Sequence, residues 1–132
     1  MTESPLTPEQ QGQIVAVAMD MARDGRTADL VEFLDHGFPL DQQDPAGNTL
    51  VMLAAYHGHL DTVTTLVARG ADVDRRNDRD QSPVAGAMFK GEDEVVRVLV
   101  AAGADLDAGS PTARATAALF GQQHLIDGED RP

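Results

Sequence analysis

Two sets of glycines and one set of aspartates recur along this chain at a spacing of 33 residues. They are Gly37, Gly70 and Gly103; Gly25, Gly58 and Gly91; and Asp41, Asp74 and Asp107. Self-similarity at a fixed period of about 20–50 residues is the signature of a repeat architecture, in which each period is one supersecondary unit. Such a unit cannot bury its apolar face alone, so its neighbours must stack on it, and the period predicts a solenoid.

Each unit is predicted to contain a helix, a tight turn, a second helix and a loop. Thr49 and Ser82 stand where a first helix begins and are predicted N-caps, and Pro83 suits the first helical position. Gly58 fits a turn of positive φ, because glycine has no Cβ. Apolar residues then recur with helical spacing along the second helix; they are Leu60, Val63, Leu66 and Val67. Gly70 fits a left-handed cap after that helix.

The two ends of the array depart from the repeat. Thr7, Pro8 and Gln10 form a capping-box pattern, which predicts a helix over 8–23. At the other end, Ser110 is the predicted cap of a helix that begins at Pro111, followed by at most a stub of a second helix.

A loop deletion of several residues fits this C-terminal end as well as an unbroken period does. The predicted domain spans 7–126, with units of about 7–43, 44–76, 77–109 and 110–126. We expect 1–6 to be flexible and 127–132 to be a disordered tail.

The repeated units strongly resemble the ankyrin repeat family. The resemblance is carried by "GNTLVMLAAYHGH" and "GADVDRR" in one unit and by "QSPVAGAMFKGE" and "GADLDAG" in the next. It implies an all-α ankyrin repeat solenoid with about three full repeats and a truncated C-terminal capping unit. It also implies a small stand-alone protein, which we expect to be bacterial, that binds other proteins through hairpin tips and short inner helices.

Some positions depart from the family pattern. Leu50 replaces the usual proline, and Met52 and Ala85 replace a histidine that commonly forms hydrogen bonds within the turn. Gly86 lies inside a short helix, where it should cost about 1 kcal/mol relative to alanine. We interpret it as a tight contact between helices; a weakened repeat that adjusts on binding is the alternative.

The composition narrows the classes of partner. The formal net charge is −12, which disfavours nucleic acid and anionic membranes and would steer a partner with a basic surface toward the chain. Acidity that only keeps the protein soluble is the alternative. No apolar run approaches about 20 residues and no signal peptide is visible, so we expect a cytoplasmic location.

His57 and His59 raise the question of a metal site. A zinc site needs three or four convergent ligands, and the other two histidines, His36 and His124, lie in other units. Because Gly58 recurs with the period, we interpret it as the structural residue of this motif. The recurring aspartates also favour a structural role over paired catalytic carboxylates. We therefore expect no metal, no cofactor and no enzyme activity.

The predicted partner-binding residues lie at hairpin tips and on inner helices. They are Asn48, Tyr56, His57, Asp78, Arg79, Gln81, Phe89 and Lys90. Tyr56 and Phe89 are aromatic residues at equivalent positions of adjacent units, so we expect them to lie side by side as anchors. The predicted function is a non-catalytic, monomeric adaptor or inhibitor. The alternatives are a metal- or small-molecule-binding protein and a self-stacking structural subunit.

Overall fold

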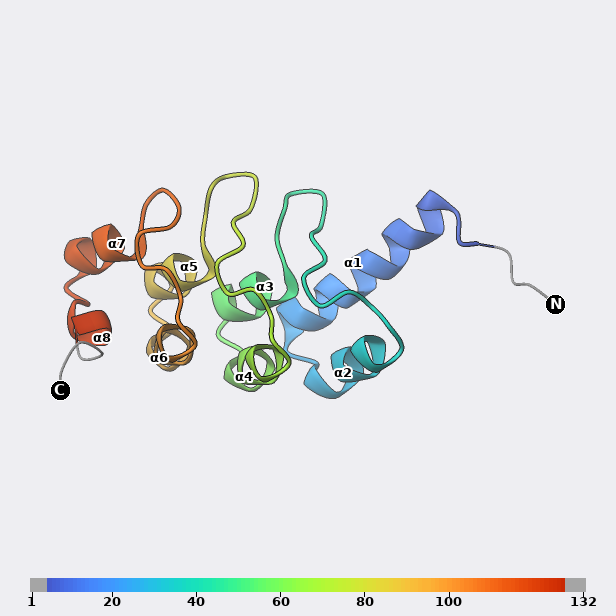
Figure 1. Ribbon diagram of the computed structural model, residues 1–132, viewed down its shortest axis with the longest axis horizontal. Helices are drawn as coiled ribbons and strands as arrows, with labels where there is room; N and C mark the ends of the chain where they lie inside the picture. Colours follow the sequence, from blue (N-terminus) through green and yellow to red (C-terminus); the bar gives the residue numbers. More distant parts are fainter. Residues whose placement is uncertain (1–4, 128–132) are drawn as a thin grey trace.

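The computed structural model describes residues 5–127, and within this range the chain forms eight helices in two layers (Figure 1). The inner layer contains α1 (Pro8–Asp24), α3 (Leu50–Tyr56), α5 (Pro83–Phe89) and α7 (Ala113–Phe120). The outer layer contains α2 (Thr27–Asp35), α4 (Leu60–Ala68), α6 (Asp93–Ala101) and α8 (His124–Asp127). The loops that connect each outer helix to the next inner helix project on one side of the stack (Figure 1). The all-α helical solenoid predicted from the period is confirmed.

The inner helices begin at the predicted caps. The Thr49 hydroxyl accepts a hydrogen bond from the Met52 N–H at 3.2 Å, and the Ser82 hydroxyl does the same for the Ala85 N–H at 3.2 Å. These bonds satisfy N–H groups that have no partner within the helix. At the N-terminal end, Thr7 forms the predicted capping box, and α1 extends to Asp24, one residue further than predicted.

Small side chains let the inner helices approach one another closely. Seven alanines of this layer are fully buried: Ala18, Ala22, Ala54, Ala55, Ala87, Ala113 and Ala117. Each inner helix contacts the next, and the outer helices add Val63, Leu66, Val96 and Leu99 to the same core. Stacking thus buries the apolar face that a single unit would expose.

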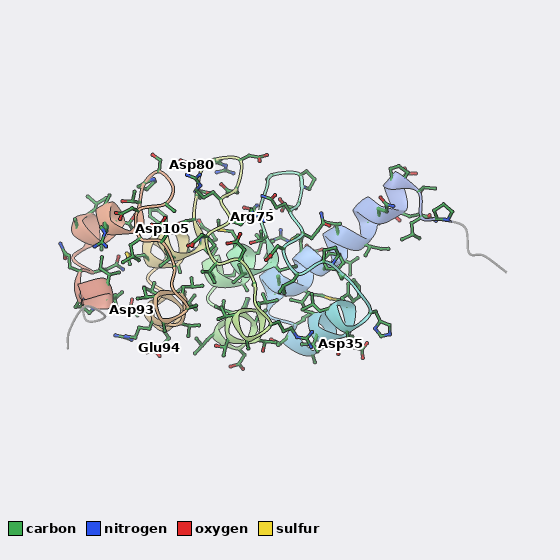
Figure 2. The ribbon with its side chains drawn as sticks, viewed as in Figure 1. Asp35, Arg75, Asp80, Asp93, Glu94 and Asp105 are labelled. Atoms are coloured by element: carbon green, nitrogen blue, oxygen red, sulfur yellow. The ribbon has the colours of Figure 1, made fainter. Side chains whose placement is uncertain are left out.

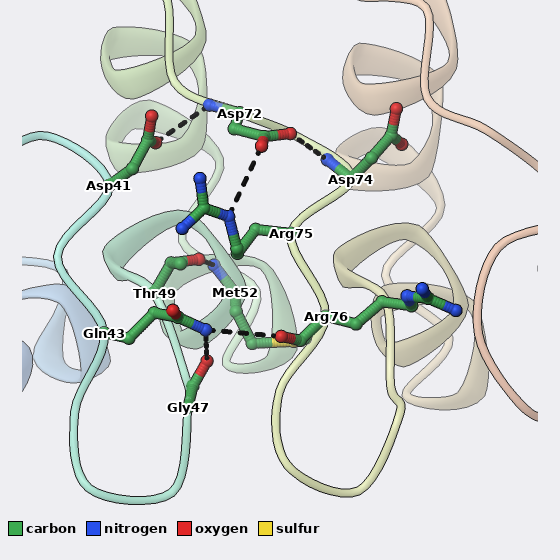
Figure 3. Close-up of polar contacts among 9 residues, drawn as sticks. All are labelled: Asp41, Gln43, Gly47, Thr49, Met52, Asp72, Asp74, Arg75 and Arg76. Carbon is green, nitrogen blue, oxygen red and sulfur yellow. Dashed lines mark hydrogen bonds and ion pairs between the residues drawn. The ribbon is translucent and has the colours of Figure 1, made fainter.

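The recurring aspartates connect one unit to the next. The Asp41 carboxylate accepts the backbone N–H of Asp72 at 2.9 Å, as shown in Figure 3. Asp74 accepts the N–H of Asp105 at 2.7 Å, one period later. Asp107, one period further on, accepts a hydrogen bond from the Arg114 side chain of α7 at 3.0 Å. The structural interpretation of these aspartates is confirmed.

Adjacent hairpin loops are also hydrogen-bonded to each other. Gln43 donates from Nε2 to the carbonyl of Gly47 in its own loop and to that of Arg76 in the next, at 2.8 and 3.3 Å (Figure 3). The backbone N–H of Asp78 reaches the Ala46 carbonyl at 2.9 Å. In the next pair of loops, the backbone N–H of Ser110 donates to the Asp80 carbonyl. The hairpin loops therefore form a row in which each loop is hydrogen-bonded to the next.

The C-terminal end differs from the prediction. Ser110 does not cap a helix and α7 does not begin at Pro111; Thr112 accepts from the Ala115 N–H, and the helix begins at Ala113. This start lies 30 residues after the start of α5, whereas α5 begins 33 residues after α3. The last hairpin is therefore shorter, as the deletion alternative proposed.

The predicted termini fall mostly outside the described residues. Of the segment 1–6, Pro5 and Leu6 are described and exposed, and 1–4 lie outside the range. Of the tail 127–132, Asp127 is the last residue of α8, and 128–132 lie outside the range.

Candidate functional site: the inner face

The inner helices and the hairpin loops together form one surface, which we call the inner face. Two hollows adjoin in its centre, with volumes of about 200 and 170 Å³. Tyr56 and Gln81 line both hollows. The first also borders Asn48, His57 and Arg79, and the second borders Phe89. A larger hollow of about 430 Å³ lies further along, between α1 and the first hairpin loop.

The Tyr56 ring lies at the contact between α3 and α5. A Cβ built on Gly86 would be 3.4 Å from Tyr56 Cδ1 and 3.9 Å from Met52 Sδ. The ring therefore lies over α5 at Gly86, at a distance that still leaves room for a methyl group. The expected contact between the two helices is present at Gly86, but it does not require a glycine.

Phe89 is exposed and pairs with a residue that sequence reasoning missed. Its side chain is 61% exposed, and its ring meets the ring of Phe120 edge to face at a centroid distance of 5.8 Å. Tyr56 and Phe89 border the same hollow, but each ring packs on a different partner. The sequence predicts that Tyr56 and Phe89 lie side by side; both border this hollow, and the ring that Phe89 meets edge to face is that of Phe120.

Phe120 is not at the position of Phe89 in the repeat; Leu119 is, because Phe89 and Leu119 are each the seventh residue of their helix and each stands two positions before a glycine. Phe120 follows it at the end of α7, which is one residue longer than α5, so the period does not reveal Phe120. A sequence signal was present nonetheless. An aromatic residue stands one or two positions before the glycine that follows each of α3, α5 and α7, at Gly58, Gly91 and Gly121.

Two basic residues of the inner face lack the ion pairs that the other basic residues form. The described residues include nine of the ten Lys and Arg side chains, since Arg131 lies outside them. Seven of these nine form an ion pair with a nearby carboxylate, and the remaining two are Arg79 and Lys90. Arg79 lines the 200 Å³ hollow, and Lys90 Nζ lies 4.9 Å from the centroid of the Tyr56 ring.

The two histidines have different environments. His59 lies over the Gly25 turn, where its ring leaves no room for a Cβ, and its Nε2 is 2.7 Å from the Arg23 carbonyl. A carbonyl only accepts, so Nε2–H is the donor. His59 is thus a connection between the first two units. The described residues contain no group of three or more His, Asp or Glu side chains placed to hold a metal ion.

His57 is exposed beside the Tyr56 ring, at a centroid distance of 5.4 Å. Partial burial lowers the pKa of His57 below its usual value of 6.5, and the positive charges of Arg23, His59 and Lys90 lower it further. Asp24 acts in the opposite direction. The imidazole is therefore neutral at pH 7 and offers a hydrogen bond rather than a charge.

The remaining predicted site residues divide into two groups. Asn48 and Gln81 are half-buried and both accept hydrogen bonds from Asn77 Nδ2, at 2.8 Å each, so their side chains hold the loops together. The side chains of Asp78 and Arg79 are exposed at the hairpin tip. The structure thus brings Tyr56, His57, Arg79, Gln81, Phe89 and Lys90 around the two central hollows.

Paired helices stacked at a 33-residue period define a helical repeat protein. A model of ankyrin repeats, in three copies, matches residues 18–110. The chain belongs to the ankyrin repeat family. Ankyrin repeat domains are typically protein-binding modules and are generally non-catalytic. No helix in the described range has the length and apolar character needed to cross a membrane.

Two curated relatives match part of the chain. An ankyrin repeat protein of Pseudomonas aeruginosa is 44% identical over 66 residues, which cover 48% of this chain and 38% of that protein. The human ankyrin repeat domain-containing protein 29 is 47% identical over 53 residues, which cover 39% of this chain and 18% of that protein. The chain therefore spans well under half the length of either relative.

Proposed function

We propose that this chain is a non-catalytic adaptor or inhibitor that holds one partner protein on its inner face. The observation that carries the proposal is the exposure of Phe89 at the centre of that face. A phenylalanine that is 61% exposed and lines one of the two central hollows is the kind of aromatic anchor that dominates binding energy at protein interfaces.

Acidic residues occur on both sides of the stack: Asp93 and Glu94 lie at the start of α6 in the outer layer, and Asp80 lies in a hairpin loop (Figure 2). The net charge of −12 steers a partner with a basic surface toward the molecule as a whole. We expect the protein to act as a monomer in the cytoplasm and to bind neither nucleic acid nor membrane.

The test is affinity capture of crosslinked partners from the source cells, read by mass spectrometry. Phe89→Ala is compared with wild type, because an exposed side chain can be removed without opening the core. Arg97→Ala on the outer layer is the matched control. A protein retained by wild type and the control but lost with Phe89→Ala supports the proposal. Equal recovery by all three chains would place binding elsewhere.

Self-association is the second candidate function, and one observation favours it. Leu119 is 77% exposed on α7, the last inner helix, and Phe120 beside it is 49% exposed. A second copy could cover this apolar end. Light scattering at rising protein concentration tests this candidate. A mass that doubles for wild type but stays monomeric for Leu119→Lys would support it, and a constant monomeric mass would exclude it.

A further inference from the structure

The groove formed by the two central hollows has a local charge opposite to that of the molecule. The chain carries 22 acidic residues and ten basic ones, so a basic side chain without an ion pair is the exception. Among the described residues the two exceptions are Arg79 and Lys90, and both flank Tyr56, which lines both hollows. These charges are available to a bound group.

The two charges act at contact range, whereas the net charge acts at long range. Exposed charges are screened beyond a Debye length of about 8 Å at physiological salt. The acidic majority therefore guides the approach of a partner, but the groups within a few ångströms decide what occupies the groove. Lys90 Nζ lies 4.9 Å from the centroid of the Tyr56 ring, and the attraction between a cation and an aromatic face favours this position beside the groove.

The residues that line the two hollows include Arg79 and no carboxylate. Partial burial lowers the pKa of His57, the charges of Arg23, His59 and Lys90 lower it further, and Asp24 raises it. Arg23 is itself paired with Asp20, which reduces its availability. His57, being neutral at pH 7, can donate a hydrogen bond to an anionic group placed beside it.

The second hollow is apolar and suits a hydrophobic side chain. It is lined by Tyr56, Ala85, Gly86, Phe89, Pro111 and Thr116, together with Gln81. Its volume of about 170 Å³ and that of its neighbour, about 200 Å³, both fall below the roughly 300–1,000 Å³ typical of small-molecule pockets. Hollows of this size suit single side chains of a polypeptide better than a cofactor.

We propose that the groove binds a linear segment of the partner protein in which an aspartate or glutamate lies close to an aromatic or large aliphatic side chain. The carboxylate contacts Arg79, His57 and Lys90. The apolar side chain enters the hollow between Tyr56 and Phe89. This inference rests on the proposed function and gives the chemistry of the segment that the inner face recognises.

The test is selection of random twelve-residue linear peptides, displayed on phage, against the immobilised full chain. Three chains are used: wild type, the groove variant Arg79→Glu/Lys90→Glu, and the control Arg26→Glu/Arg97→Glu. The control changes the net charge equally but on the outer layer. Circular dichroism checks the fold of each chain. Wild type and control should enrich peptides with an acidic residue within about two positions of an aromatic or aliphatic one, and the groove variant should not.

An enriched peptide is then synthesised with a fluorescent label and its affinity is measured by anisotropy. Arg79→Gln/Lys90→Gln should weaken binding about tenfold, the control no more than about twofold, and Phe89→Ala at least tenfold. Acidic peptides that bind the groove variant equally well would overturn the inference.

The remaining outcomes separate the inference from the proposed function. Neutral or basic peptides whose binding is lost in Phe89→Ala would overturn the acidic chemistry but keep the inner face as the binding surface. Binding that neither Phe89→Ala nor the groove variant changes would overturn both. If no peptide is enriched, a linear acidic segment is not the ligand, and the inner face is then judged by the crosslinking experiment with intact proteins.

Discussion

Replacing Gly86 by alanine should stabilise the fold. Alanine is preferred over glycine in a helix interior by about 1 kcal/mol, because glycine loses more backbone freedom on folding. The new Cβ would lie 3.4 Å from Tyr56 Cδ1 and 3.9 Å from Met52 Sδ, which are ordinary van der Waals distances. With no clash to offset the helix preference, the free energy of unfolding should rise by about 0.5–1 kcal/mol.

The same substitution at Gly58 should have the opposite effect. Gly58 has φ of +75°, where a residue with a Cβ is disfavoured by about 1–2 kcal/mol. The added Cβ would also run into the carboxylate of Glu92, but this is the free end of a flexible side chain and can move. The free energy of unfolding should therefore fall by about 1–2 kcal/mol, mostly through backbone strain.

Urea denaturation followed by circular dichroism measures both changes, and an unchanged m value shows that the comparison is valid. The thermal midpoint should shift by about 4 °C per kcal/mol, upward for Gly86→Ala and downward for Gly58→Ala. A lower midpoint for Gly86→Ala would refute the reasoning. It would mean that the Tyr56 ring cannot accommodate a methyl group and that packing outweighs helix preference at this contact.

Three further predictions concern the recurring aspartates and the two histidines. Asp74→Ala leaves a backbone N–H of the next unit without its acceptor and should lower the free energy of unfolding by about 1–2 kcal/mol. Asp107→Ala loses only a side-chain partner and should lower the free energy of unfolding by less than about 0.5 kcal/mol. Equal urea midpoints for the two variants would contradict this. His59→Ala should cost about 1 kcal/mol in the same assay, and an unchanged midpoint would show that its bond to α1 contributes nothing. The pKa of His57 lies below 6.5 in the folded state, so the folded state binds fewer protons than the unfolded state as the pH falls. Protonation of His57 should therefore lower the free energy of unfolding as the pH falls through 6.5, and it should have no effect well above pH 6.5. An NMR titration should give a midpoint below 6.5 that rises toward 6.5 in Lys90→Gln; a midpoint at or above 6.5 in wild type would contradict the assignment.

The fold could be predicted from the sequence because backbone requirements repeat at every period. Gly58 and Gly91 both take positive φ, and Thr49 and Ser82 both cap a helix, so independent positions agree on one register. The prediction failed at Ser110, where the shortened hairpin interrupts that register. Cap residues are frequent in loops, so Thr112 and Ser110 could not be told apart without the period.

The candidate site could be predicted only in part. Exposed residues such as Phe89 and Lys90 follow from their place on the repeat. The sequence does not show whether a polar side chain at a hairpin tip faces outward or toward the neighbouring loop. Asn48 and Gln81 face inward, because Asn77 lies between them and offers both hydrogens of its amide. The sequence also does not show that Arg79 and Lys90 are the described basic residues without an ion pair, because ion pairing depends on which carboxylates the fold brings near.

The connected row of hairpins has a consequence for the thermodynamics of binding. Each loop is bonded to the next, as Asp78 is to Ala46 and Ser110 is to Asp80, so the loops lose their conformational freedom when the chain folds. A partner then meets a preorganised surface and the entropy of ordering it is not lost a second time. Affinity is thereby coupled to stability. A substitution that breaks one of these bonds should weaken binding by loosening the free protein, even where no atom of the partner comes near.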